Sequence, residues 1–328
     1  MIKILLVMMT LAQASSFREK LKERFSKRQE EKPAPIAVVA SDTPITKPGD
    51  YTFTFVHNGI SRFYKLHVPG SYKAGVPTPL VFAFHGGGGN MSYMADDSKY
   101  GLISKSEQAG FIAVFPNGTS KYKSGILATW NAGEGGGYAR ENKIDDVGFV
   151  KEVIAKVSKQ LSIDPKKIFS TGMSNGASLS YRLACEMSDV FKAIAPVAGT
   201  NVTKDCSPKN PISILHIHAK NDDHVQFNGG AGKNAKNLMK NFVSVPATIE
   251  KWVSLNGCNI TPKRVLEKIG AYCDLYSSCK NNVEVKLCVT ETGAHSWPGG
   301  KETRASEPTS KAISANDVLW DFFLSQGK

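Results

Sequence analysis

Apolar runs bounded by glycines and polar turns alternate with helix-length segments through most of the chain. Pro79–Phe84 is the clearest example, a continuous apolar run typical of a parallel strand that is buried on both faces. The predicted strands lie near residues 80–84, 111–115, 167–171, 193–197, 212–218 and 283–290, and the predicted helices near 98–109, 145–162, 176–187, 245–256 and 315–326. This alternation predicts an α/β fold with a mostly parallel central sheet and helices on both faces.

A β-hairpin is predicted ahead of this alternating region. Residues 51–56 and 61–68 are strand-like segments on either side of Asn58-Gly59. That dipeptide favours a type I′ turn, whose twist matches the twist of paired strands.

The amino-terminal residues have a different composition from the rest. Residues 1–14 combine a positively charged start, a short apolar stretch and a small-x-small site ending at Ala14, which predicts a signal peptide and a secreted, extracellular or periplasmic protein. The apolar stretch is too short for a transmembrane segment. Residues 15–49 are predicted as a charged helical segment and a linker, and residues 50–328 as one α/β domain.

A single serine lies in a G-x-S-x-G frame between a predicted strand and a predicted helix. In Gly172-Met173-Ser174-Asn175-Gly176 the glycines permit a very tight turn. Such a turn, a nucleophile elbow, raises the serine hydroxyl above the sheet beside the free N–H groups of the helix amino terminus. The context favours Ser174 as a nucleophile over a serine in an ordinary strand–helix turn.

An aspartate and a histidine follow the serine, each just beyond a predicted strand. The strand near 212–218 leads into a loop with Asp222 and Asp223, and the strand near 283–290 leads into a loop with His295. The order serine, acid, histidine is that of the α/β-hydrolase triad. His216, His218 and His224 near this acid suggest a metal site only weakly, and packed histidines are the preferred interpretation.

A glycine-rich loop follows the first buried strand. His85-Gly86-Gly87-Gly88-Gly89-Asn90 can turn backbone N–H groups toward the serine, as an oxyanion hole requires. A phosphate-binding loop is disfavoured, since the segment has no P-loop Lys-Ser/Thr and no G-x-G-x-x-G leading directly into a helix.

These motifs together resemble a family of secreted esterases that includes polyhydroxybutyrate depolymerases, feruloyl esterases and acetylxylan esterases. They occur in family order over about residues 50–327, which is nearly the whole predicted mature chain. The matching segments are His85–Asn90, Trp130–Gly133, Asp145–Phe149, Gly172–Ala177, Ala193–Gly199, Ser244–Pro246, Trp252 with Asn256–Cys258, and His295–Gly299. The resemblance implies an α/β-hydrolase fold and a serine carboxylesterase that needs no cofactor and no metal.

The resemblance also implies roles for individual residues. His218 and Val225 bracket Asp222 as the triad acid, with Asp223 as the alternative one residue away. The implied oxyanion donors are the backbone N–H groups of Asn175 and Gly87, and Gly86 or Gly88 could replace the latter. Trp130 and Trp297 are candidate walls of the substrate pocket, with packing roles as the equally weighted alternative.

Six cysteines fit an oxidising compartment, and none has C-x-x-C spacing. Six cysteines allow 15 pairings, and the sequence alone does not choose among them. We expect Cys185 to pair with Cys206, because the helix and the loop that carry them flank one strand. The resemblance implies Cys258 with Cys279, which leaves Cys273 with Cys288.

The 328-residue chain has a formal net charge of +12 and 41% hydrophobic residues. A basic balance can reflect nucleic-acid binding, but no basic stripe with stacking aromatics is present. The expected partner is therefore an ester substrate, and the oligomeric state is left open. The leading prediction is a feruloyl/acetylxylan-type esterase, with a depolymerase of hydroxyalkanoate polymer or oligomer as the alternative. A catalytically silent hydrolase-fold binding protein is the alternative from another class.

Overall fold

A computed structural model describes residues 43–122, 124–135, 137–230, 232, 242–301 and 308–326. These residues belong to one compact unit, Val38–Lys328. The predicted signal peptide, the charged helical segment and most of the predicted linker lie outside the described residues. Within the described part of the chain, no helix has the length and apolar character needed to cross a membrane.

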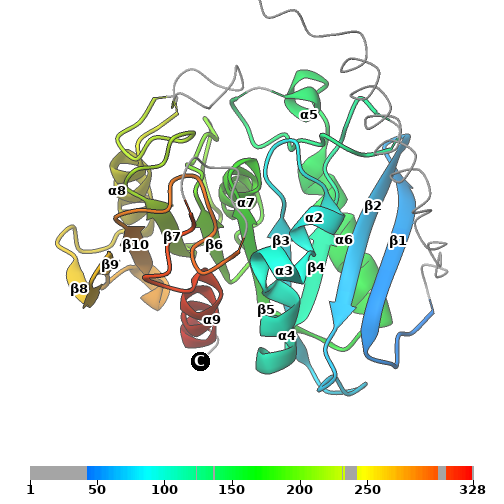
Figure 1. Cartoon of the computed structure of the whole chain (residues 1–328). Coiled ribbons are helices and arrows are strands. Elements are labelled where there is room, and N and C mark those ends of the chain that lie inside the picture. Colours follow the sequence, from blue (N-terminus) through cyan, green and yellow to red (C-terminus); the bar gives the residue numbers. More distant parts are fainter. Residues whose placement is uncertain are drawn as a thin grey trace, which may run out of the picture. The chain divides into compact units, whose positions relative to one another are not determined.

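One ten-stranded sheet forms the centre of this unit (Figure 1). Its order is β1-β2-β4-β3-β5-β6-β7-β10-β9-β8, and the six strands from β4 to β10 in this order run parallel. The strands are β1 Gly49–His57, β2 Ile60–Val68, β3 Thr78–Phe84, β4 Ile112–Pro116, β5 Ile163–Met173, β6 Ala193–Val197, β7 Ser213–Ala219, β8 Lys263–Lys268, β9 Ala271–Tyr276 and β10 Val285–Thr290. The six strands predicted from apolar runs are all present. The α/β-hydrolase architecture is therefore confirmed.

The predicted hairpin is also present. Strands β1 and β2 pair antiparallel, with His57 opposite Ile60. Asn58 and Gly59 both have positive φ, 49° and 77°, as a type I′ turn requires.

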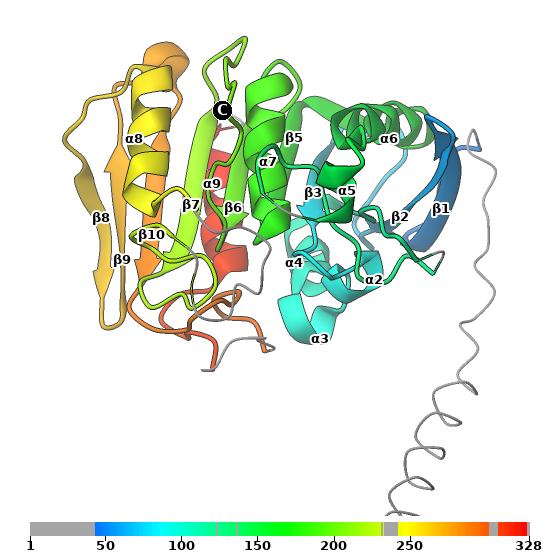
Figure 2. The same cartoon turned by 90° about the horizontal axis from the view of Figure 1, so that it is seen from above.

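Helices cover both faces of the sheet (Figure 2). One apolar core joins the sheet to α6, α7 and α8, through residues such as Phe149, Leu179 and Trp252. A second core on the opposite face joins it to α4 and α9, through residues such as Leu102 and Phe323. The helices are α2 Met91–Met94, α3 Asp97–Tyr100, α4 Leu102–Ala109, α5 Tyr138–Glu141, α6 Asp146–Gln160, α7 Asn175–Glu186, α8 Val245–Asn256 and α9 Ala315–Gln326.

Two features differ from the predicted pattern. The helix predicted at 98–109 is divided into α3 and α4 by Gly101, whose φ of 64° ends the first helix in the left-handed conformation. The antiparallel pair β8–β9 was not predicted, because β8 is almost entirely exposed and has no apolar run.

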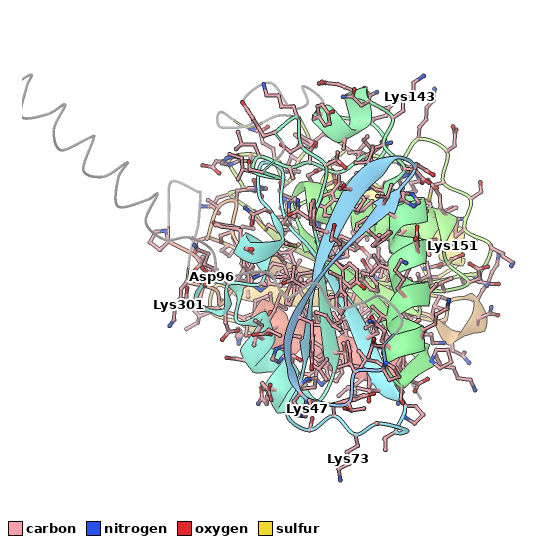
Figure 3. The ribbon with its side chains drawn as sticks, turned by 90° about the vertical axis from the view of Figure 1, so that its right-hand side faces the viewer. Lys47, Lys73, Asp96, Lys143, Lys151 and Lys301 are labelled. Carbon is pink, nitrogen blue, oxygen red and sulfur yellow. A yellow bond between two sulfur atoms is a disulfide. The ribbon has the colours of Figure 1, made fainter. Side chains whose placement is uncertain are left out.

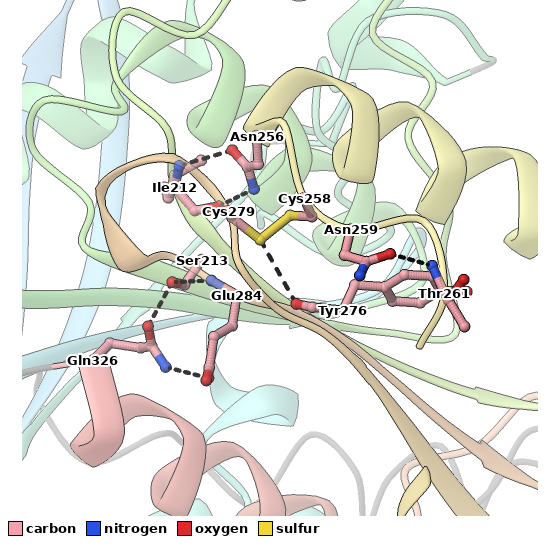
Figure 4. Close-up of a disulfide and its surroundings, with 10 residues drawn as sticks. All are labelled: Ile212, Ser213, Asn256, Cys258, Asn259, Thr261, Tyr276, Cys279, Glu284 and Gln326. Atoms are coloured by element: carbon pink, nitrogen blue, oxygen red, sulfur yellow. Dashed lines mark hydrogen bonds between the residues drawn. A yellow bond between two sulfur atoms is a disulfide. The ribbon is translucent and has the colours of Figure 1, made fainter. Parts of the chain in front are cut away.

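Three disulfides join the cysteines in the predicted pairs. They are Cys185–Cys206, Cys258–Cys279 and Cys273–Cys288, with no cysteine left free. The second attaches the end of α8 to the loop after β9 (Figure 4). Beside it the side chain of Asn256 accepts from Ile212 N at 3.1 Å and donates to Ile212 O at 2.8 Å, which holds α8 against the start of β7.

Most basic side chains lie on the surface, as the labelled Lys73, Lys143 and Lys151 illustrate (Figure 3). Arg62 on β2 is an exception, since its side chain is 2% exposed. Its Nη2 atom lies 2.6 Å from Oδ1 of the fully buried Asp146, at the start of α6. The guanidinium also covers the ring of Phe149 at 3.8 Å, so this ion pair joins β2 to α6.

Replacing Asp146 by asparagine should lower the free energy of unfolding by about 3–5 kcal/mol, because Arg62 would keep a buried charge without its counterion. Asp189→Asn is the control, since the Asp189–Lys209 pair is largely exposed and should contribute less than about 1 kcal/mol. Urea unfolding of both variants provides the comparison. Equal losses in the two would show that the buried pair does not stabilise the fold more than the exposed one.

Candidate active site

The predicted functional residues follow the carboxyl ends of the parallel strands. Ser174 follows β5 directly, Asp222 lies three residues beyond β7 and His295 lies five residues beyond β10. Since these strands run parallel, their carboxyl ends open at one edge of the sheet, where α/β proteins bind their ligands. The glycine-rich loop after β3 opens at the same edge.

Ser174 occupies a strained turn between β5 and α7. Its φ of 57° and ψ of −116° are rarely adopted by a residue with a side chain. Its backbone N–H donates to Val197 O at 2.9 Å, which ties the turn to β6. The flanking glycines are explained by close packing: a Cβ at Gly172 would lie 2.6 Å from backbone atoms of Gly176, and one at Gly176 would lie 2.3 Å from Phe84 O.

Asp222 and His295 lie in direct contact with each other at the carboxyl edge of the sheet. The Nδ1 atom of His295 is 2.9 Å from Oδ2 and 3.1 Å from Oδ1 of Asp222. A carboxylate can only accept, so Nδ1 carries the proton and donates it. The neutral imidazole therefore keeps an unprotonated Nε2, the state of a general base.

The carboxylate of Asp222 is buried and well supplied with donors. The backbone N–H groups of His224 and Val225 both donate to Oδ1 at 2.8 Å. Burial by itself would raise the pKa of Asp222, but His295 and the hydrogen bond from His218 outweigh it and hold the pKa far below its ordinary value. Asp222 therefore stays ionised throughout the physiological pH range.

Asp223 has a different environment. Its Oδ1 atom lies 2.7 Å from Nδ1 of His224, and both side chains are partly exposed. The structure thus brings Asp222, the residue selected by the family pattern, to His295. The neighbouring carboxylate belongs to a second Asp–His pair.

The glycine-rich loop narrows the choice of oxyanion donors. Gly88 N–H donates to Ala128 O at 2.8 Å, and Gly89 N–H donates to Gly86 O at 2.9 Å. The N–H of Gly88 is already hydrogen-bonded to Ala128, so Gly88 does not fit as the substitute donor, while Gly87 and its alternative Gly86 stay predictions. Asn175 begins α7, where backbone N–H groups have no acceptor within the helix.

Residues 63–245, more than half of the chain, match the family described as Esterase PHB depolymerase. The chain belongs to this esterase family. A probable feruloyl esterase C from Aspergillus niger is 32% identical over 275 residues, which cover 82% of this esterase and 86% of the relative. Feruloyl esterase B from Piromyces equi is 28% identical over 239 residues. These residues cover 71% of this chain and 42% of that relative's length.

Solved structures support the same fold. An acetyl xylan esterase from Aspergillus awamori superimposes with a TM-score of 0.56, covering 83% of this esterase and 98% of that chain. The two sequences are 13% identical, so this likeness establishes the α/β-hydrolase fold and nothing finer.

The two candidate pocket tryptophans of the esterase are each only 1% exposed. Trp130 Nε1 donates to His85 O at 2.9 Å, and the Trp130 backbone exchanges two hydrogen bonds with the Asn175 side chain. Trp297 Nε1 donates to Asn316 Oδ1 at 3.0 Å. Both indoles therefore have a packing role in this structure, and contact with substrate stays a prediction.

A second histidine lies beside the Asp222–His295 pair. The His224 ring stacks on the His295 ring, with centroids 4.5 Å apart and an interplanar angle of 20°. Asp222, His224 and His295 offer ligand atoms within 4.8 Å of one another, a geometry that could hold a metal ion. The contacts described above account for the cluster without one, since His295 Nδ1 is bonded to Asp222 and His224 Nδ1 to Asp223.

Sequence reasoning missed one residue near the acid. Tyr181 on α7 reaches His216, one of the histidines interpreted as packed residues of the strand. The alternation of His216 and His218 placed both on one face of a strand leading to Asp222, which was the available signal. No sequence pattern indicated that Tyr181, on a helix distant in sequence, would contact His216.

Proposed function

We propose that this protein is a secreted serine carboxylesterase of the feruloyl/acetylxylan type, with Ser174, His295 and Asp222 as its triad. The observation that carries the proposal is the bonded Asp222–His295 pair at the sheet edge that also holds the strained Ser174 turn. The names of the curated relatives support the feruloyl part of this substrate class, and the acetylxylan part follows the name of the acetyl xylan esterase that shares the fold.

In this mechanism His295 Nε2 takes the proton of the Ser174 hydroxyl as the oxygen attacks the ester carbonyl. Asp222 holds the imidazole in the required tautomer and stabilises the imidazolium that forms. The developing oxyanion accepts hydrogen bonds from backbone N–H groups of Asn175 and Gly87. The alcohol leaves with a proton from His295, and water then hydrolyses the acyl-enzyme by the reverse proton transfers.

Secretion is part of the proposal and rests on two features. The first 14 residues have the pattern of a signal peptide, and all six cysteines form disulfides, which persist in oxidising compartments. Expression with the native amino terminus, followed by mass spectrometry of the exported protein, would locate the cleavage site.

A panel of esters tests the substrate class. The protein without residues 1–14 should release ferulate from methyl ferulate or acetate from acetylated xylan with a higher kcat/KM than it shows on hydroxybutyrate oligomers. p-Nitrophenyl acetate and butyrate report general ester hydrolysis. Measuring all five substrates on one preparation removes differences in active fraction.

The panel also separates the alternatives. Preference for hydroxybutyrate oligomers would favour a depolymerase, the activity named in the description of the matched family. Folded protein that hydrolyses none of the five esters would overturn the enzymatic proposal in favour of a binding protein.

A further inference from the structure

A continuous chain of buried side chains connects α7 to the carboxylate of Asp222. Tyr181 Oη lies 2.6 Å from His216 Nδ1, and His216 Nε2 lies 3.0 Å from His218 Nδ1. His218 Nε2 lies 2.8 Å from Val225 O and 3.3 Å from Asp222 Oδ2. Tyr181, His216 and His218 are at most 1% exposed, so water does not compete for these bonds.

For a neutral His218, the acceptors at the Asp222 end determine the direction of every hydrogen bond in this chain. His218 Nε2 faces a carbonyl and a carboxylate, both of which can only accept, so Nε2 carries the proton. A neutral His218 then has a bare Nδ1, which accepts from His216 Nε2–H. The remaining nitrogen of His216, Nδ1, is bare in turn and accepts from the Tyr181 hydroxyl.

The neutral forms that this direction requires agree with the surroundings. Burial lowers the pKa of His216 well below its ordinary value, with His218 adding to the effect, so His216 is neutral. Burial likewise raises the pKa of Tyr181 well above its ordinary value, so the phenol keeps the proton it donates. The ring planes of His216 and His218 are nearly parallel, with an interplanar angle of 4° and centroids 5.2 Å apart, which agrees with a hydrogen bond made in the planes of the rings.

We propose that Tyr181, His216 and His218 form a directional hydrogen-bond relay that positions the acid of the triad. The single donor at the end of the relay, His218 Nε2–H, bonds Val225 O at 2.8 Å and also faces Oδ2 of Asp222 at 3.3 Å. Because Oδ1 takes the N–H groups of His224 and Val225, the carboxylate is held from both sides and cannot rotate away from His295. The three residues act through Asp222 and are positioning residues. This inference rests on the proposed function, since it concerns the acid of that triad.

The relay gives its first residue a defined task. If His218 carried its proton on Nδ1 instead, its Nε2 lone pair would face the carboxylate and the carbonyl, and both contacts would be repulsive. The Tyr181 hydroxyl favours the productive tautomer, because it supplies the donor that His216 Nδ1 requires. Loss of this hydroxyl should therefore affect a carboxylate three polar contacts away.

Paired substitutions test the relay through turnover of p-nitrophenyl acetate. His218→Leu removes the donor and should lower kcat about 10- to 100-fold, the range expected for loss of a hydrogen bond to a charged group, with KM within about threefold. His218→Gln places an amide N–H near the position of Nε2 and should recover most of that loss. Tyr181→Phe should lower kcat about three- to tenfold, the range for a neutral bond.

The pH profile provides a readout that a purely structural role would not move. Without the His218 donor, Asp222 and the His295 beside it should both hold protons more tightly, because the carboxylate becomes more basic. The acid limb of kcat/KM should therefore shift to higher pH in His218→Leu. His224 and Asp223 also face this pair and are unchanged in the variant, so they do not contribute to the shift.

Tyr64→Phe is the matched control for Tyr181→Phe. Tyr64 is also buried, but it lies on β2, with four strands between it and β7. It should leave kcat and the pH profile unchanged. An equal loss of kcat in the two variants would overturn the relay.

Imidazole NMR tests the relay without turnover, and so separates its failure from that of the proposed function. Long-range ¹H–¹⁵N spectra of the Ser174→Ala protein should show His216 and His218 as neutral Nε2–H tautomers, with His216 shifting to a mixture in the Tyr181→Phe background. A proton on His218 Nδ1 would overturn the assigned direction. If His218→Leu fails to fold, His218→Gln, Tyr181→Phe and these spectra still decide.

Discussion

Ser174→Ala should lower kcat for p-nitrophenyl acetate by about six orders of magnitude, the loss found when the nucleophile of a serine hydrolase is removed. In the proposed triad only the hydroxyl oxygen of Ser174 forms a bond to the acyl group, so no neighbouring group replaces it. Stopped-time assays at high protein concentration, with the uncatalysed rate subtracted, provide the measurement. A fluorophosphonate probe should label the unmodified protein at Ser174 and leave the variant unlabelled.

Ser180→Ala is the matched control for this substitution. Ser180 lies on α7, the helix that begins after Ser174, and its buried hydroxyl accepts from Ser170 at 2.8 Å and donates to Gly176 O at 3.2 Å. It should retain activity within about tenfold, since it loses two neutral hydrogen bonds and contacts no residue of the proposed triad through its hydroxyl. Substantial turnover by a folded Ser174→Ala protein would exclude Ser174 as nucleophile.

Asp222→Asn should lower kcat about 10⁴-fold with little change in KM. Its amide can donate to His295 Nδ1, which stabilises the tautomer whose Nε2 carries a proton and cannot accept one from Ser174. The carboxylate accepts hydrogen bonds from three donors in the buried site and lies 3.3 Å from His218 Nε2, so a modest loss of thermal stability should accompany the loss of activity.

Asp223→Asn distinguishes the two adjacent carboxylates. Asp223 bonds His224 rather than His295, so its substitution should leave kcat within about tenfold of the unmodified enzyme. The opposite ranking of the two variants would assign the triad acid to Asp223. Circular dichroism of both proteins separates a catalytic loss from unfolding.

The central strands could be predicted because each one carries its own signal. Strands such as β3 and β6 are buried on both faces, and their sequences are apolar throughout. The exposed strand β8 had no such signal, because four of its six residues are charged and its pairing with β9 depends on the hairpin as a whole. Local patterns thus identify the middle of the sheet and the β1–β2 hairpin at one edge, but not the β8–β9 pair at the other edge.

The residues of the candidate site also differ in whether the sequence could identify them. Ser174 and His295 lie in motifs that can be recognised within a few residues, and the spacing between His218 and Val225 selects Asp222. The contact of Tyr181 with His216 joins residues 35 positions apart on different elements, so no local pattern indicates it. The burial of Trp130 and Trp297 could be known only from the structure, because an indole in a loop next to a motif can face either the interior or the substrate.

The composition of β8 also bears on how this protein behaves at high concentration. An open sheet ends in strands whose unpaired backbone groups can bind the edge of another molecule. Lys263, Arg264, Glu267 and Lys268 make β8 an exposed strand with a surplus of positive charge. Two such strands repel each other when they approach, so association of copies through this side of the sheet is electrostatically opposed.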